Sequence, residues 1–196
     1  MKKLLTALAP FLAIAFLLYV TVGRYYNNAI VYQEDAKTAW SKVESAYQRR
    51  ADLIPNLVNT VKGYAKHEKE TLEAVIKARA AATQTKIDPT NITPEQLAQF
   101  QQAQQGLSGA LSRLLVTVEK YPELKADKHF LELQSQLEGT ENRIKVERDR
   151  FNDAVNVYNI HIKKFPGRLF AGLFGFKEMA RFSSEKGAEK APKVEF

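Results

Sequence analysis

The sequence predicts an all-α protein in which one N-terminal transmembrane helix precedes an antiparallel bundle of about four long helices. Three observations support this fold class. An uncharged apolar run occupies the N-terminus, apolar residues after it recur every three or four positions, and glycine and proline are scarce, with the prolines between the periodic segments. We therefore divide the chain into an anchor (1–23), a long-helix bundle (24–166), and an apolar segment with a C-terminal tail (167–196).

The composition narrows the class of protein. The 196 residues are 45% hydrophobic and 26% charged, which suits one packed domain and argues against disorder. The net charge of +7 comes from basic residues interleaved with acidic ones, as in Lys66-His67-Glu68-Lys69-Glu70. Such alternation is typical of solvated helix faces, so we expect no nucleic acid among the partners. Cysteine is absent from the chain, which excludes disulfides and thiolate sites.

The apolar run from Leu4 to Val22 has the length of a membrane span. About 19 helical residues reach roughly 28 Å, enough to cross the hydrocarbon core. The alternative is a cleaved signal peptide, but the run exceeds the roughly 7 to 15 apolar residues of such peptides. Lys2 and Lys3 precede the run closely, whereas Arg24 is the only base soon after it. The positive-inside tendency therefore predicts a cytoplasmic N-terminus and an extracytoplasmic domain.

Two apolar stripes fill the first half of the bundle. Only Gly23 separates the anchor from the first stripe, so we expect this helix to leave the membrane without a linker. A second stripe runs from Ile54 to Ile76; Asp52 is its expected N-cap, with Pro55 in the first turn, where a missing N–H costs little. The first stripe consists of Ala29, Tyr32, Ala36, Trp40, Val43 and Tyr47.

Start and stop signals define the second half of the bundle. Thr93-Pro94-Glu95-Gln96 is a capping box with proline at the first helical position, and Tyr121-Pro122 ends the helix that follows. Asp127 is the expected cap of the last long helix, which Phe165-Pro166-Gly167 stops. The stripes repeat at close to 3.5 residues, which predicts shallow crossing angles in an antiparallel bundle.

Three polar residues interrupt the apolar stripes. Gln104 lies in the third stripe, and Thr140 and Glu147 lie in the fourth. We favour a position at the stripe edge, or a contact with a partner such as Arg50 or Arg148, because buried carboxylates are rare. The alternative is a polar network inside the bundle, which would have to be fully paired.

The segment from Leu169 to Phe176 is apolar but only about half the length of a membrane span. We expect it to pack on its own domain; the alternatives are the membrane interface and a partner protein. The tail from Ser183 to Phe196 mixes lysine and glutamate with small residues, and we expect it to be disordered or lightly docked.

The sequence offers no pattern for catalysis. Position 71, four residues beyond His67, holds threonine, so the second ligand of a zinc-protease helix is missing. None of the three histidines follows a glutamate by three positions, which removes the di-iron bundle pattern. Ser108 lies between two glycines inside a helical stripe rather than in a strand-to-helix turn. We therefore expect a non-catalytic protein without a metal or cofactor.

Three stretches carry a family resemblance. They are AWSKVESAYQRRADLIPNLVNTVKGYAKHEKETLEAV (39–75), the polar and apolar positions between Asn142 and Asn159, and the stretch that begins at Phe165-Pro166, with its end at 191–196. Together they resemble the LemA family of bacterial membrane proteins. The resemblance implies a single-pass anchor in the bacterial inner membrane, a long-helix bundle, and a role in envelope maintenance or membrane organisation. It implies no catalytic residues, and it suggests a membrane zinc protease as a partner.

The expected function is therefore a membrane-tethered scaffold or adaptor of the cell envelope that contacts the lipid bilayer, a membrane or envelope protein, or further copies of itself. The alternatives are a membrane-shaping or lipid-binding protein and, remotely, an unrecognised enzyme. We expect the motif's polar residues to fix the turn after the first helix and to face it across the bundle, or else to dock a partner. The candidate positions, including two of the apolar segment, are Arg50, Asp52, Asn56, Asn142, Arg148, Phe170 and Phe174.

Overall fold

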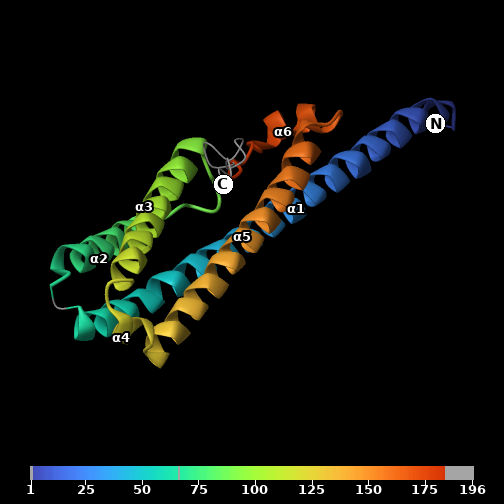
Figure 1. Cartoon of the computed structure of the whole chain (residues 1–196). Coiled ribbons are helices and arrows are strands. Elements are labelled where there is room, and N and C mark those ends of the chain that lie inside the picture. Colours follow the sequence, from blue (N-terminus) through green and yellow to red (C-terminus); the bar gives the residue numbers. More distant parts are fainter. Residues whose placement is uncertain (1, 66, 184–196) are drawn as a thin grey trace, which may run out of the picture.

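The computed structural model describes residues 2–65 and 67–183, and every regular element within these ranges is a helix. The all-α prediction is confirmed. Successive long helices reverse direction, as an antiparallel bundle requires (Figure 1). The six elements are α1 (Lys2–Tyr64), α2 (Lys69–Gln84), α3 (Pro94–Val118), α4 (Pro122–Lys125), α5 (Lys128–Lys163) and α6 (Gly167–Phe174).

Helix α1 runs for 63 residues without a break, from the apolar N-terminus to the far tip of the bundle (Figure 1). The helix continues through Gly23, as the sequence predicts. It also continues through Asp52 and Pro55, so the expected N-cap and turn at this point are wrong. The second stripe is divided instead: its first part belongs to α1, and the remainder, including Leu72 and Val75, belongs to α2. The chain reverses only after Tyr64.

Proline is tolerated inside α1 because another helix uses the carbonyl that it leaves free. A proline has no N–H for the carbonyl four residues earlier, which here is that of Ala51. The guanidinium of Arg79 on α2 donates to this carbonyl oxygen through Nε at 2.7 Å. Asp52 does not cap a helix start; its carboxylate accepts a hydrogen bond at 2.7 Å from the amide of Gln48, one turn earlier on the same helix.

The helices associate as two pairs. Helix α5 lies antiparallel along α1, and α2 and α3 form a hairpin that packs against the far half of α1 (Figure 1). The start signals work as predicted. Thr93 and Gln96 form the reciprocal capping box at the start of α3, and the Asp127 carboxylate accepts from the backbone N–H of Phe130 at 2.9 Å.

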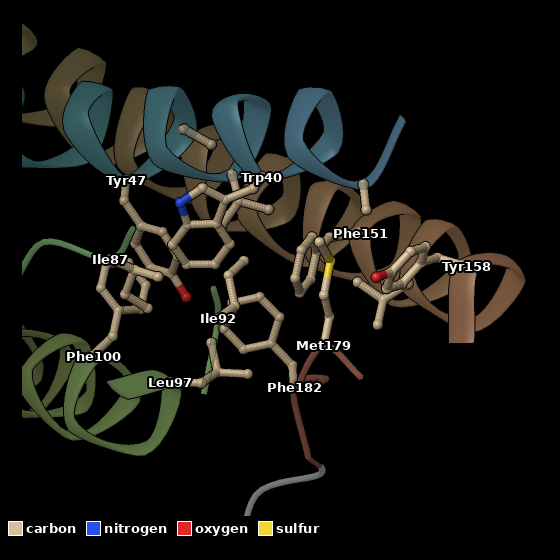
Figure 2. Close-up of a cluster of buried hydrophobic side chains, with 14 of the residues drawn as sticks. Trp40, Tyr47, Ile87, Ile92, Leu97, Phe100, Phe151, Tyr158, Met179 and Phe182 are labelled. Atoms are coloured by element: carbon tan, nitrogen blue, oxygen red, sulfur yellow. The ribbon is translucent and has the colours of Figure 1, made fainter. Parts of the chain in front are cut away.

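The apolar core consists of two clusters along the bundle. One surrounds Trp40 and combines α1, α3 and α5 with the chain beyond α6, which contributes Met179 and Phe182 (Figure 2). The rings of Phe151 and Phe182 lie 5.3 and 5.9 Å from that of Trp40. The second cluster fills the far end, where α1 meets α2, α3 and the start of α5.

The N-terminal part of α1 projects beyond its partner helices (Figure 1). Its apolar side chains are exposed there, and within the described residues α1 is the one helix long and apolar enough to cross a membrane, judged by length and composition. The most apolar 18-residue window has a mean hydropathy of 1.6, and only 6% of it is buried in the protein. An exposed apolar segment of this length fits a membrane span.

Candidate interaction surfaces

Arg50 is a buried charge where several helices meet. Its side chain leaves α1 and is 3% exposed. Nη1 donates to the carboxylate of Glu141 on α5 at 2.8 Å and to the hydroxyl of Ser108 on α3 at 3.0 Å. Nη2 donates to the side-chain oxygen of Gln104 on α3 at 2.7 Å, and the Gln104 amide donates in turn to the carbonyl of Ala82 on α2 at 3.2 Å. Arg50 therefore joins α1 to α3 and α5 directly, and to α2 through Gln104.

The three interrupting residues, Gln104, Thr140 and Glu147, are all buried. The expectation that they lie at the edge of the stripe is therefore wrong. The expected contact with Arg50 is confirmed for Gln104. Glu147 is tolerated because Oε1 accepts from Arg143 at 2.8 Å and from Arg150 at 3.0 Å, and both arginines reach back from the surface. The Thr140 hydroxyl donates to the carbonyl of Gln136 one turn earlier.

The remaining polar candidates divide into contacting and exposed positions. Arg148 shares a small pocket with Arg50, Tyr47 and Glu141, and its guanidinium lies 4.6 Å from the centre of the Phe182 ring. Asn56 and Asn142 are exposed, so the expectation that Asn142 faces Arg50 is wrong; Glu141, one residue earlier, makes that contact. The motif thus identifies the correct stretch of α5 but the wrong residue.

An open cleft of about 870 Å³ lies between α1, α2 and α3. Its apolar lining includes Tyr47, Leu53 and Phe100, and Gln104 of the Arg50 network also lines it. Charged side chains of both signs line it as well, which suits a polypeptide rather than a small ion. These charged residues are Glu44, Arg49, Asp52 and Lys86.

Helix α6 lies beside the point where α1 leaves its apolar segment. The Phe170 ring is 5.4 Å from that of Tyr25, and the Phe174 ring is 5.1 Å from that of Tyr26. Gly167 allows this approach, because a Cβ there would lie 2.6 Å from the Tyr25 ring. The apolar segment therefore packs on α1 and α5, as the sequence predicts, with part of its surface exposed.

Two asparagines on α5 hold the chain beyond α6 in an extended path along the bundle. Asn159 pairs with both the N–H and the carbonyl of Met179, at 3.0 and 2.9 Å. Asn152 pairs in the same way with Phe182, at 2.8 and 3.1 Å. We call residues 176–182 the strap. Sequence reasoning missed the role of these asparagines; their seven-residue spacing beside an apolar stripe was the available signal. The predicted tail lies outside the described residues, apart from Ser183.

Hydrogen bonds and burial shift the pKa values of several groups. The backbone N–H of Phe130 and the hydroxyl of Tyr64 bind the Asp127 carboxylate and hold its pKa below the usual value of 3.8. Burial raises the pKa of Tyr158 to about 12, and its hydroxyl donates to the carbonyl of Lys177 in the chain that follows α6. Within residues 2–65 and 67–183, no three acidic, histidine or cysteine side chains gather as metal ligands would.

The apolar extension of α1 and the bundle behind it define a membrane-associated helical protein. The sequence model of the LemA family matches residues 39–196, and the chain belongs to that family. It is similar to magnetosome protein MamQ 2 of Paramagnetospirillum magneticum, with 29% identity over 85% of this chain and 67% of the relative. Magnetosome protein MamQ of Magnetospirillum gryphiswaldense is 28% identical over 97% and 75%, and protein LemA of Metamycoplasma hominis is 27% identical over 79% and 66%.

Proposed function

We propose that this protein is a single-pass, non-catalytic scaffold or adaptor of the bacterial cell envelope that holds a docking cleft at a fixed distance from the membrane. The continuity of α1 is the observation that carries this proposal. One helix of 63 residues, about 95 Å long, includes both the membrane-spanning segment and a complete side of the bundle. No flexible linker separates the two, so the bundle cannot move independently of the anchor.

Several contacts keep this long helix straight outside the membrane. Helix α5 supports it along its length, and the Arg79 side chain occupies the carbonyl freed by Pro55. Arg50 links it to the α2–α3 hairpin through Gln104. These contacts favour a rigid spacer over a hinged binding domain.

The cleft between α1, α2 and α3 is the proposed docking surface. Its α1 residues, from Ser41 to Leu53, begin 18 positions after Gly23, which corresponds to roughly 27 Å of helix. A partner that is itself embedded in the same membrane, such as a membrane zinc protease, could reach this height with a domain of ordinary size. A second copy of the chain is the other occupant that the proposal allows, through a homo-oligomer.

Photo-crosslinking in the intact membrane tests the scaffold. A photoreactive residue at Ser45, inside the cleft, should give a discrete crosslinked product in cells, whose mass identifies either a partner or a dimer. The same residue at Asp149, exposed on α5 outside the cleft, is the matched control. The product from Ser45 should disappear when Arg49→Glu reverses a charge that lines the cleft. Equal products from both positions, or none from Ser45, would contradict the proposal.

Metal analysis tests the non-catalytic part of the proposal. The full-length protein purified from membranes should contain zinc and iron well below one equivalent per chain. A stoichiometric amount of either metal, retained after treatment with a chelator, would contradict a purely structural role and would indicate an enzyme.

A further inference from the structure

Helix α6 is amphipathic, and its apolar outer face has no partner within the described residues. Its inner face packs against the bundle, and Gly167 and Ala171 on this face are buried. Leu169 and Leu173, four residues apart on α6, are 67% and 75% exposed, and Phe165, in the turn before the helix, is 85% exposed. Residues four apart share one side of a helix, so Leu169 and Leu173 form an apolar patch, and Phe165 adds an exposed ring just before the helix begins.

Helix α6 adjoins the apolar surface of the anchor at Phe174. The ring of Phe174, at the end of α6, lines an open groove of about 890 Å³ together with Leu18, Tyr19, Val22 and Tyr26 of α1. Leu18 and Tyr19 belong to the exposed apolar segment that the scaffold proposal places in the bilayer. An element that contacts these residues lies at the depth where the helix passes from hydrocarbon to water.

The charges around α6 also suit a membrane surface. Between positions 162 and 179 the chain carries the basic residues Lys163, Lys164, Arg168 and Lys177 against one acid, Glu178, which pairs with Lys163 at 2.7 Å. Arg24 adds a base at the same level of α1. A short apolar face bordered by basic residues is the pattern of a helix lying in the headgroup region.

We infer that α6 is an interfacial membrane helix. Its outer face, Leu169 and Leu173, together with Phe165 in the preceding turn, enters the headgroup and upper acyl region of the leaflet from which α1 emerges. The bilayer is the occupant because α6 adjoins the anchor's own lipid-facing surface at Phe174, and basic residues border the exposed leucines. The tilted contact between the rings of Phe170 and Tyr25 joins the interfacial helix to α1, so the protein touches the membrane at two points and its orientation on the surface is fixed.

The inference rests on the anchor of the proposed function, but not on the cleft. The inference also assigns different roles to the aromatic residues in this segment. Phe170 and Phe174 pack on tyrosines of α1 and position the helix, whereas Phe165 and the two leucines make the lipid contact.

Tryptophan quenching by brominated lipids tests the lipid contact in the full-length chain. The native Trp40 is fully buried in the core and provides a constant background. We expect the additional emission of Leu173→Trp to fall by about half in phosphatidylcholine–phosphatidylglycerol vesicles brominated near the headgroup, because the ring lies at that depth. Val116→Trp, at a position 70% exposed on α3, is the matched control and should not be quenched. Equal quenching of the two variants would overturn the inference.

Cysteine accessibility provides a second measurement. It avoids introducing a tryptophan, whose ring itself favours the membrane interface. The chain contains no cysteine, so single replacements report unambiguously. Leu169→Cys in pure lipid vesicles should react with a water-soluble maleimide about tenfold more slowly than Val116→Cys, because lipid covers it. Equal rates would contradict the inference, and protection that arises only when membrane proteins are added would assign the patch to a protein partner instead. If α6 remains exposed while the Ser45 crosslink persists, this inference fails and the scaffold proposal stands.

Discussion

Arg50 shows how a single buried charge organises the junction of four helices. Its guanidinium is held by a carboxylate, a hydroxyl and an amide from two different helices, which places the α2–α3 hairpin at a defined position on α1. Burying a charge is unfavourable unless it is paired; the two Nη atoms find partners only in this arrangement, whereas Nε has no hydrogen-bond partner within the described residues. Such a residue favours one arrangement of the helices over sliding alternatives. Arg50 therefore contributes to the choice of a single helix arrangement as much as to the free energy of unfolding.

Replacing Arg50 with alanine should destabilise the bundle by about 2–3 kcal/mol, because Gln104 loses its buried partner and a cavity remains. Equilibrium urea unfolding followed by circular dichroism measures the change. Arg49→Ala, one position earlier and exposed, is the control and should stay within about 0.5 kcal/mol of the parent. A loss no greater than that of Arg49→Ala would show that the network contributes nothing.

The Asp127 cap makes stability depend on pH in the acid range. Its carboxylate pKa is lower in the folded protein than the usual 3.8, so its contribution is fully present above 3.8 and disappears as the pH falls through the folded value. Asp127→Asn keeps a capping oxygen and removes the charge. The parent should therefore lose stability on acidification more steeply than Asp127→Asn, as acid-range urea unfolding would show. Parallel pH profiles would contradict the assignment.

At the scale of elements, Pro55 and Arg79 explain why α1 does not end where the sequence suggests. Proline within a few residues of aspartate resembles a helix start, and the local sequence contains no information about the arginine 24 positions later that satisfies the free carbonyl of Ala51. The starts of α3 and α5 were predictable because their caps, Thr93 and Asp127, act within three residues. Local signals are visible in the sequence; compensation by another helix is not.

The strap and the Arg50 network show that long-range contacts of the candidate site were likewise not predictable from the local sequence. The sequence selected Arg50 and Arg148 from a polar motif but could not supply their partners. Glu141 and Gln104 are separated from Arg50 by 91 and 54 residues, and Phe182 contacts Arg148 from an irregular segment with no periodicity. The positions of Asn152 and Asn159 became meaningful only when the strap was seen beside them.

A double-mutant cycle tests the compensation at Pro55. Arg79→Ala should cost about 1.5 kcal/mol in the parent, since it removes a charged hydrogen bond to a carbonyl that has lost its helical partner. In the Pro55→Ala background an N–H can occupy that carbonyl, so the same change should cost about 1 kcal/mol less. Urea unfolding of the four proteins provides the comparison. Additive effects would mean that the two residues do not share the Ala51 carbonyl.

At the scale of the whole molecule, α1 and the bundle form one body attached to the membrane by the same helix that builds the core. The two core clusters lie one after the other along α1, and the strap seals the cluster nearer to the membrane. In the proposed arrangement, the mixed-charge cleft and the amphipathic helix lie at two different heights above the bilayer. A scaffold requires such fixed spacing, whereas a loosely tethered domain does not provide it.

The basic residues before the anchor predict a cytoplasmic N-terminus and an extracytoplasmic bundle. In spheroplasts, a membrane-impermeant maleimide should label Asp153→Cys, exposed on α5, without lysis. Lys2→Cys should be labelled only after the membrane is opened. The reverse pattern would place the bundle in the cytoplasm.

The distance from the anchor to the bundle tests the central claim, an uninterrupted α1, most directly. Spin labels at Leu12→Cys and Ser45→Cys flank Gly23, and a continuous helix places the two positions about 50 Å apart. A control pair within the bundle, Thr38→Cys and Lys62→Cys, should report about 36 Å. In lipid nanodiscs, double electron–electron resonance should give one narrow distribution for each pair, equally sharp. A broad or shortened distribution for the Leu12–Ser45 pair, with a sharp control, would show that the helix breaks near Gly23 and that the bundle is not held rigidly to the membrane.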